Sequence, residues 1–330
     1  MGVDELFKCC VPGVKSKAPH HFKSVANTRV AIDISCLLHA YVSKPKNALS
    51  MCCSPPYAPT DVVTSLEFHH NILKLHNIVP YYVFDGYRHP MKSATNLERD
   101  NKRKEARKLL DMFYERGKDP DIELTDEDHT KAMKYIKTIA SPTNEIISLV
   151  RCWLEDNKIN YMCAPFEAEW QCVHLEQVNE VDAIMSTDGD CIILGAKKVC
   201  YNVNFNNHTF NLCDIEIEVK EKELNPLFKC DVDKWPLIAS LLGCDYVDRI
   251  KNVGYATIFN KILPKLVDWS PNEVMIVINS TLKQKITEQH KDQFSKRNIF
   301  SQSSKLFFSV PKLSLTFLSP QMYNVYFYYL

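Results

Sequence analysis

Three short apolar segments that each run into an aspartate constrain the fold of this chain more than any other feature. They cover residues 30–32 before Asp33, 81–84 before Asp85, and 181–187, interrupted by Asp182, before Asp188. Apolar runs of this length are typical of strands buried on both faces of a parallel sheet. A helical pattern over residues 61–76 separates the first two segments. Strands that alternate with helices predict an α/β fold, with a parallel sheet flanked by helices.

The three aspartates are expected to lie close together. The carboxyl ends of parallel strands meet at one edge of the sheet, and ligands bind at that edge in folds of this type. A single aspartate after a strand is commonly only a helix cap. Three of them at the same edge, Asp33, Asp85 and Asp188, favour a functional site over capping.

Four further acids stand at the ends of predicted elements. Glu167 and Glu169 fall in the first turn of a helix predicted over residues 167–175, which follows a short strand at residues 160–163. The helix dipole alone would also explain two acids there. Asp190 follows Asp188 by two residues, and Asp245 follows a buried helix predicted over residues 235–243. The sequence therefore predicts a cluster of seven carboxylates.

Seven carboxylates at one place would repel one another strongly unless cations were bound between them. Hard divalent cations prefer oxygen ligands, and Mg²⁺ is the expected ion because it keeps water in its shell, with Mn²⁺ as a substitute. Two such ions about 4 Å apart can activate an attacking water and stabilise the leaving oxygen of a phosphodiester. No Ser–His or Cys–His arrangement in the sequence competes with this interpretation.

A basic stretch begins seven residues after Asp85. Residues 92–108 contain seven lysines and arginines against three acids and favour a helix, and a second helix is predicted over residues 126–138. A helix of mixed charge is most often a solvated surface. Its position beside the predicted acidic edge instead indicates a basic rim that could contact phosphates.

Overall composition excludes several classes of protein. The chain has 40 basic and 40 acidic residues, so nucleic-acid binding would have to come from local segregation of charge. No run of 18 apolar residues is present, which argues against a membrane-spanning helix. Thirteen cysteines without a CxxC motif or a secretory signal indicate reduced thiols in the cytosol or nucleus and not a zinc site.

With these features the sequence resembles the superfamily of flap endonucleases, exonuclease 1 and excision-repair nucleases, which share a PIN-like α/β core. The resemblance covers residues 1–266. The matching segments are Met1-Gly2-Val3 with Leu6, Val30-Ala31-Ile32-Asp33, Val83-Phe84-Asp85-Gly86, Ala164-Pro165-Phe166-Glu167-Ala168-Glu169, Ser186-Thr187-Asp188-Gly189-Asp190-Cys191 and Leu242-Gly243-Cys244-Asp245-Tyr246.

This resemblance implies a role for each site residue. Asp33, Asp85, Glu167 and Glu169 would hold one ion or its waters, and Asp188, Asp190 and Asp245 would complete the second. Lys92 and Arg99 match a basic pair that polarises the scissile phosphate, so they are the expected catalytic residues together with Asp188. The expected DNA contacts are made by Gly2, His39, Arg103 and Gly254.

The resemblance also implies a division of the chain. Residues 1–91 and 139–230 would form the nuclease core, 92–138 a helical arch, 231–270 a region like a helix-two-turn-helix, and 271–330 a divergent tail. The family's duplex-binding motif usually reads Gly-Ile-Gly with a later alanine. Here it reads Asn252-Val253-Gly254 with Ile258 at the alanine position, which weakens the expectation of bound K⁺. Residues 321–328 loosely resemble a sliding-clamp peptide, although an aromatic core segment explains them better.

The function expected from these features is that of a structure-specific 5′ nuclease acting on DNA ends, nicks or flaps in the nucleus, as a monomer. His39 and residues 196–199 are similar to the exonuclease 1 branch, whereas substrate preference between recessed ends and flaps stays open. Two alternatives also stay open. One is a catalytically silent DNA-junction binder, and the other is a nuclease that acts on RNA.

Overall fold

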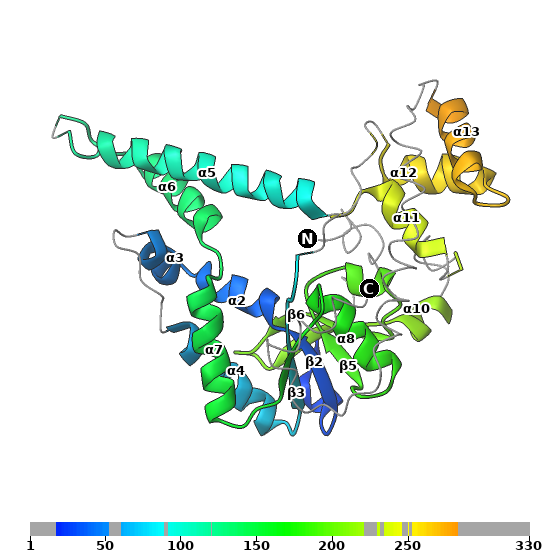
Figure 1. Ribbon diagram of the computed structural model, residues 1–330, viewed down its shortest axis with the longest axis horizontal. Helices are drawn as coiled ribbons and strands as arrows, with labels where there is room; N and C mark the ends of the chain where they lie inside the picture. The colour runs from blue at the N-terminus through cyan, green and yellow to red at the C-terminus, as the bar shows by residue number, and fades with distance from the viewer. Residues whose placement is uncertain are drawn as a thin grey trace, which may run out of the picture.

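A seven-stranded mixed sheet forms the centre of the molecule (Figure 1). The computed structural model describes residues 18–52, 61–88, 92–119, 121–220, 230–231, 234–245, 250 and 253–282. The strand order is β1-β7-β6-β5-β2-β3-β4. The parallel strands are β2 (Arg29–Asp33), β3 (Val79–Phe84), β4 (Tyr161–Cys163), β5 (Ala183–Met185) and β6 (Lys198–Asn204). The antiparallel strands β7 (Thr209–Asp214) and β1 (His20–His21) extend one side of the sheet.

The predicted parallel strands are confirmed, and their register places the acids at one edge. Asp33 on β2 lies beside Val83 on β3, so Asp85 follows only two residues further along the neighbouring strand. The parallel strand β6 and the antiparallel strands β7 and β1 were not predicted. Strand β7 is buried only at Phe210 and Cys213 and contains Asn211 and Asp214, so it lacks the apolar run that identifies the predicted strands.

Two layers of helices cover the sheet. Helices α2 (Ile34–Val42), α4 (Asp61–Leu75) and α7 (Asn144–Asp156) pack on the face to which Val30 and Ile32 point. Helices α8 (Ala168–Gln177), α9 (Asp190–Ile193) and α11 (Trp235–Leu242) pack on the face to which Ala31 points. Successive side chains of a strand point to opposite faces, which is why an unbroken apolar strand supplies both cores.

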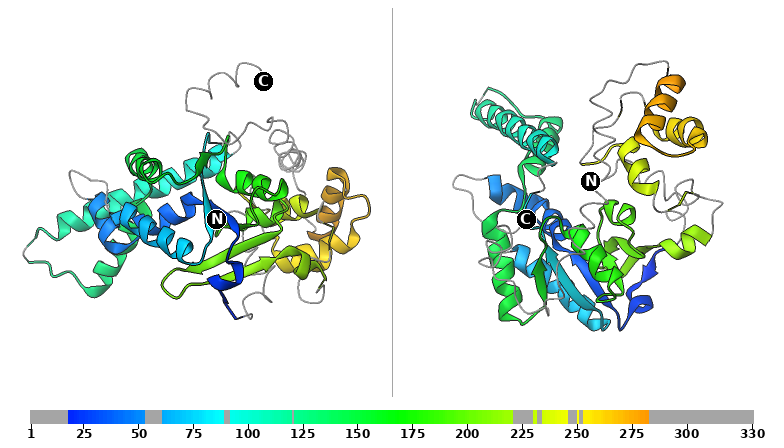
Figure 2. Two further views of the ribbon diagram at one scale, coloured as in Figure 1. Left: turned by 90° about the horizontal axis from the view of Figure 1, so that it is seen from below. Right: turned by 45° about the vertical axis from the view of Figure 1, so that its right-hand side comes forward.

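Two antiparallel helices project from this body (Figures 1 and 2). They are α5 (Ser93–Arg116) and α6 (Asp126–Ile139), and the second begins with a capping box between Thr125 and Asp128. The end of α6 is anchored because Ile136 and Ala140 pack against Ala48 of α3 (Pro45–Cys52). The pair occupies the residues expected for a helical arch, although the division of the chain into domains stays a prediction.

The C-terminal part of the described chain packs against α11 and belongs to the core cluster on the second side of the sheet. It comprises α12 (Tyr255–Thr257), the π-helical turn η6 (Ile258–Ile262), the 3₁₀ turn η7 (Leu263–Lys265) and α13 (Pro271–Leu282). A single regular helix over residues 258–266 is therefore wrong. Pro264 lacks the amide hydrogen that would continue the helix, and a 3₁₀ turn forms there. Residues 321–328, with the clamp-like pattern, lie outside the described residues.

Shorter elements complete the described chain: η2 (Phe22–Val25) follows β1, and α10 (Ile215–Lys220) follows β7. No helix in the described ranges is long and apolar enough to cross a membrane. Ten of the thirteen cysteines fall in these ranges, and all ten are free thiols.

Helix α13 allows a direct test of whether the segment after residue 270 belongs to the core. Ile278 is fully buried, whereas Ile276, two residues earlier on the same helix, is 68% exposed. We expect Ile278→Ala to lower the free energy of unfolding by about 2–5 kcal/mol, because it leaves a cavity in the core. The matched Ile276→Ala variant should change it by less than about 0.5 kcal/mol. Urea unfolding of the full chain measures both, and equal effects would contradict this packing.

Candidate active site

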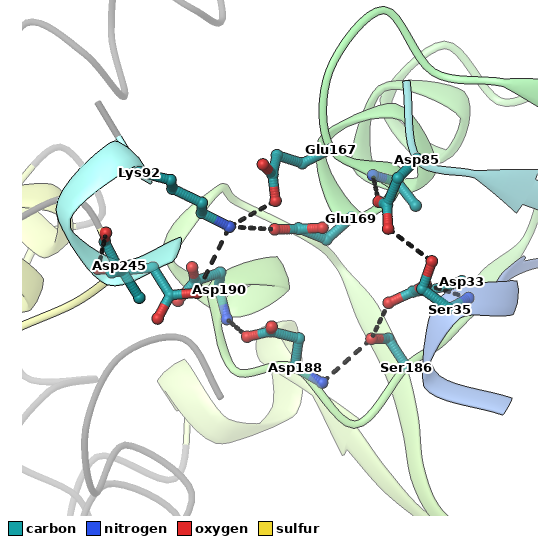
Figure 3. A network of polar contacts seen from close by, with 12 residues as sticks. Asp33, Ser35, Asp85, Lys92, Glu167, Glu169, Ser186, Asp188, Asp190 and Asp245 are labelled. Carbon is teal, nitrogen blue, oxygen red and sulfur yellow. Dashed lines mark hydrogen bonds and ion pairs between the residues drawn. The ribbon is translucent and has the colours of Figure 1, made fainter. Parts of the chain in front are cut away.

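The seven predicted carboxylates converge at the carboxyl edge of the parallel strands. They come from five places in the chain, and Glu167, Glu169 and Asp245 are the ones that pair with the ammonium group of Lys92 (Figure 3). The carboxylates are Asp33, Asp85, Glu167, Glu169, Asp188, Asp190 and Asp245. These side chains therefore lie close together in the folded chain, as expected from the sequence.

The closest carboxylate oxygens form two triads that share Glu169. One triad contains Asp85, Glu167 and Glu169, and the other contains Glu169, Asp188 and Asp190. Within each triad, one oxygen from every residue lies within 4.8 Å of the others. This grouping differs from the expected one, which placed Glu169 with one ion only. Asp33 and Asp245 stand beside the triads and are held by other partners.

Asp33 caps a helix and belongs to the acidic cluster at the same time. Its Oδ1 accepts hydrogen bonds from the backbone amides of Ser35 at 3.0 Å and Cys36 at 3.4 Å, at the start of α2. Its Oδ2 accepts from the Cys36 thiol at 3.0 Å and from the Ser186 hydroxyl at 3.2 Å. Capping and a functional position were weighed as alternatives for these aspartates, and in Asp33 both are realised.

Asp85 is positioned by a close backbone approach. Its carboxylate accepts from the Ser35 hydroxyl at 2.6 Å and from the Ala168 amide at 2.9 Å. The amide of Gly86 donates to the Phe166 carbonyl at 2.6 Å. A Cβ atom at position 86 would lie 1.9 Å from the Ala164 carbonyl oxygen, so only glycine fits. This approach brings Asp85 next to Glu167, the residue that precedes α8.

Lys92 is the internal counter-ion of the cluster. Its side chain is 6% exposed, and Nζ lies 2.5 Å from Glu167 Oε2 and 3.5 Å from both Glu169 Oε1 and Asp245 Oδ2. Buried charges persist only when they are paired in this way. The position of Lys92 immediately before α5 therefore links the projecting helices to the carboxylates.

Arg99 makes a second link between α5 and the site. Its Nη2 donates to Asp245 Oδ2 at 2.7 Å, and the hydroxyl of Thr95 donates to the Asp245 backbone carbonyl at 2.8 Å. Asp245 comes shortly after α11, which ends at Gly243 with a φ of 91°. Glycine adopts this left-handed backbone readily, and the turn directs Asp245 toward α5.

Burial raises the pKa of several of these acids. Burial, followed by the charges of Asp85 and Asp188, raises the pKa of Asp33 to about 7. Burial is also the main cause that raises the pKa of Glu167, Glu169 and Asp188, while Lys92 acts in the opposite direction. The ammonium group of Lys92 alone therefore does not balance the negative charge of the carboxylates. An all-oxygen donor set with such a deficit fits divalent cations.

A cavity of about 570 Å³ opens beside the carboxylates and contains the predicted basic residues. Lys92, Arg99, Arg103 and His39 line it, together with Asp85 and Glu167. Burial, followed by the charge of Arg103, lowers the pKa of His39. This cavity therefore combines an aromatic ring with several cationic groups at the edge of the acidic cluster.

Several residues of the site were not predicted. Ser35 and Ser186 orient Asp85 and Asp33, and Arg88 and Arg151 line the cavity. The serines stand within or beside the matching motifs, which could have identified them. Arg151 lies on α7, far from any motif, and no sequence signal marks it.

Of the four expected DNA contacts, His39 and Arg103 line the cavity, and the other two have no described place there. Gly2 lies outside the described residues. Gly254 precedes α12 and is not part of the cavity lining, so the structure does not bring it to the carboxylates.

Comparison with known families agrees with this architecture. Residues 1–106 match the XPG N-terminal domain, and residues 158–245 match the XPG I-region. The two matches together cover more than half of the chain and contain all seven carboxylates. The chain therefore belongs to the superfamily of XPG-type and flap endonuclease-type nucleases.

Two relatives and one solved structure illustrate the similarity. Exodeoxyribonuclease 1 of Saccharomyces cerevisiae is 31% identical over 188 residues, 57% of this chain and 25% of that protein. Flap endonuclease 1 of Monosiga brevicollis is 26% identical over 260 residues, 77% of this chain and 65% of that protein. This chain thus spans less than two thirds of either relative. The catalytic core of Rad2 in complex with DNA substrate has a similar fold, with a TM-score of 0.59 and 23% identity over 98% of this chain and 86% of that one.

The raised pKa of Asp33 predicts how stability depends on pH without divalent cations. The folded state binds this proton more tightly than the unfolded chain, in which an aspartate has a pKa of about 3.9. The resulting stabilisation is complete below about pH 4 and is lost as pH rises through about 7. In EDTA, we expect Asp33→Asn to make the decline in Tm between pH 5 and pH 8 shallower. Parallel curves for the variant and the parent would show that the pKa of Asp33 is not raised.

Proposed function

We propose that this chain is a structure-specific 5′ nuclease that hydrolyses DNA phosphodiesters at 5′ ends, nicks or flaps during DNA repair or replication. The observation that carries the proposal is the pair of carboxylate triads sharing Glu169, with Lys92 and Arg99 on their rim. Family membership supports it, and so does the similarity to an exodeoxyribonuclease and a flap endonuclease.

We further propose Mg²⁺ as the natural cofactor, with two ions bound and Mn²⁺ able to replace them. Asp85, Glu167 and Glu169 would hold one ion, and Glu169, Asp188 and Asp190 the other, with Asp33 and Asp245 as outer partners. Bound there, such ions would supply Lewis acidity and help to activate water. The donor atoms are all oxygens, which supports a hard cation over a softer one.

Lys92 and Arg99 are the proposed phosphate-binding residues. Arg99 uses one terminal nitrogen for Asp245, and a guanidinium group has five N–H donors. It can therefore hold Asp245 and a non-bridging phosphate oxygen at the same time. Lys92 would neutralise charge that builds up on the phosphate, since its ammonium group already lies among the carboxylates.

The cavity beside the carboxylates is proposed to receive the terminal nucleotides. The neutral ring of His39 would stack on a base, and Arg103 would pair with a backbone phosphate. Helices α5 and α6 would form a gateway for a single strand. Gly2 and Gly254 are proposed as DNA contacts because of the family resemblance alone. Binding of a K⁺ ion near Gly254 is proposed on the same ground.

Within the superfamily, we propose closer kinship of function with exonuclease 1 than with flap endonucleases. His39 supports this choice, because it is similar to the exonuclease 1 branch and its side chain lines the cavity from the last turn of α2. A nuclear location and a monomeric state follow from the proposed substrate and from the self-contained site.

Cleavage of a 5′-labelled duplex with a recessed end, beside a flapped version, tests the proposed function. We expect short 5′ products with Mg²⁺ or Mn²⁺ and none with EDTA. Asp188→Ala should lower the rate at least about 100-fold, since loss of metal-assisted stabilisation costs several kcal/mol. The matched control is Asp156→Ala, an exposed acid near the end of α7, which should cleave normally.

Cleavage of either substrate identifies a 5′ nuclease, whereas a strong preference for the flap would contradict the proposed kinship with exonuclease 1. Salt-sensitive binding without any cleavage would instead identify a catalytically silent junction binder. Cleavage of the RNA version at an equal or higher rate would contradict the proposed DNA selectivity.

A second variant pair separates Arg99 from the general charge of α5. Arg99→Ala should lower kcat about 100-fold, the size of effect seen when one donor to a transition-state oxyanion is removed. Lys102→Ala removes the same charge from an exposed position, where Lys102 pairs with Glu98. This control should leave kcat within about twofold at physiological salt. Single-turnover cleavage measures both variants, and equal losses would contradict a specific role for Arg99.

A further inference from the structure

We propose that His21, His76 and His208 form a second metal site that binds a transition-metal ion of the Zn²⁺ type. The three residues belong to separate parts of the chain: β1, the segment after α4, and the turn between β6 and β7. One ring nitrogen from each lies within 4.8 Å of the other two. The proposal does not depend on the nuclease activity of the carboxylate site.

The distances within the cluster are close to those of a coordinated ion. His76 Nε2 lies 2.9 Å from His208 Nδ1. A tetrahedral zinc ion with Zn–N bonds of 2.0–2.1 Å separates its ligand nitrogens by about 3.3 Å. A movement of a few tenths of an ångström would therefore admit the ion between these two rings. The ring of His21 lies 5.3 Å from that of His76 and 6.0 Å from that of His208, measured between centroids.

A buried framework holds the three rings together. Phe22 is fully buried, and its amide donates to the His208 carbonyl at 2.9 Å. Its ring also contacts the rings of His76 and His208, with centroid distances of 5.7 and 6.3 Å. His21 pairs with Thr209 in the sheet, one residue beyond His208. The packing of Phe22 and the pairing of β1 with β7 therefore hold the three histidines in place.

The backbone of His208 is a second, independent observation. Its φ of 54° lies in the left-handed region, which costs energy for a residue with a side chain. Glycine would satisfy the turn at lower cost, and histidine is, like asparagine, one of the residue types found there more often than most. A histidine at this strained position, with its ring facing two others, is consistent with a function of the side chain.

The chemistry of the cluster favours a borderline metal ion. Neutral imidazole suits Zn²⁺, Co²⁺, Ni²⁺ and Cu²⁺, whereas Mg²⁺ requires oxygen ligands. Three histidines leave a fourth position, and exposed His21 borders solvent that can supply a water ligand there.

Metal binding would cost two hydrogen bonds of the cluster. The first joins His76 Nε2 to His208 Nδ1, and its proton would move to the other nitrogen of its ring. The second involves His21. His21 Nδ1 accepts from the Lys23 amide at 3.1 Å, so Nε2 carries the proton of the neutral ring. Coordination through Nδ1 displaces this amide. Coordination through Nε2 moves the proton to Nδ1 and removes the acceptor, with the same result. This second bond lies on an exposed turn, where water can replace it.

The proposed ion would act as a staple for the edge of the sheet. Strand β1 has only two residues, and the ion would fasten it to the end of α4 and to the β6–β7 turn. The cluster is separate from the carboxylate site, because His76 precedes β3 and Asp85 follows it. Six residues of extended strand place these two residues about 20 Å apart.

Equilibrium dialysis of the full chain against Zn²⁺, and titration with Co²⁺ followed by visible absorbance, test the proposal. The parent protein should bind one more ion than His208→Asn or His76→Gln, and its Tm should rise on zinc binding. Affinity at this site should fall at least about tenfold in each variant, as even indirect changes around metal sites cause. Asparagine is chosen at position 208 because it tolerates the left-handed backbone.

His20→Gln is the matched control, since His20 neighbours His21 but stacks on Phe210 outside the cluster. It should bind zinc as the parent does. Ions held by the carboxylates or by cysteines would appear equally in all variants and cancel in the comparison. If circular dichroism shows that His208→Asn or His76→Gln does not fold, His21→Gln replaces that variant, because His21 is exposed. Equal zinc stoichiometry and affinity in the parent and the cluster variants would overturn the proposal.

Discussion

Mutual repulsion among buried carboxylates is the constraint on which the arrangement of this protein depends. Folding places seven acids at one edge of the sheet, where burial raises the pKa of Asp33, Glu167, Glu169 and Asp188. Ionised carboxylates at such separations require positive charge between them. Lys92 supplies one charge from the start of α5, and Arg99 supplies another beside Asp245. The fold therefore brings together more negative charge than Lys92 and Arg99 balance, and further cations would stabilise it.

The same electrostatics connect parts of the chain that are distant in sequence. Asp245 follows α11, yet its carboxylate and backbone carbonyl hold Arg99 and Thr95 of α5. Glu167 precedes α8 and holds Lys92. The start of α5 therefore depends for its placement on the charges at the site, whereas the end of α6 is anchored by packing on α3. Divalent cations bound there would compete with Lys92 for the same carboxylate oxygens.

How far the sequence predicts this structure differs from element to element. The strands before Asp33, Asp85 and Asp188 were predictable because strands buried on both faces are apolar throughout. Strands β7 and β1 were not, since a strand with polar residues on one face, or with only two residues, lacks that signal. The helix expected over residues 258–266 became a π turn and a 3₁₀ turn at Pro264, which the apolar pattern alone does not reveal. Ser35 and Arg151 joined the site only through contacts between distant segments.

By itself, the sequence determined which groups carry the chemistry: acids at the ends of strands, a basic helix after Asp85, and the motifs that resemble one nuclease superfamily. These are local properties, since hydrophobic pattern and residue type depend on near neighbours along the chain. Only the tertiary structure decided how the groups combine. Glu169 belongs to both triads, Asp33 is at once a cap and a member of the cluster, and His21, His76 and His208 meet although 187 positions separate the first from the last. Such relations depend on the register of strands and the packing of helices, which residues far apart in the sequence set together.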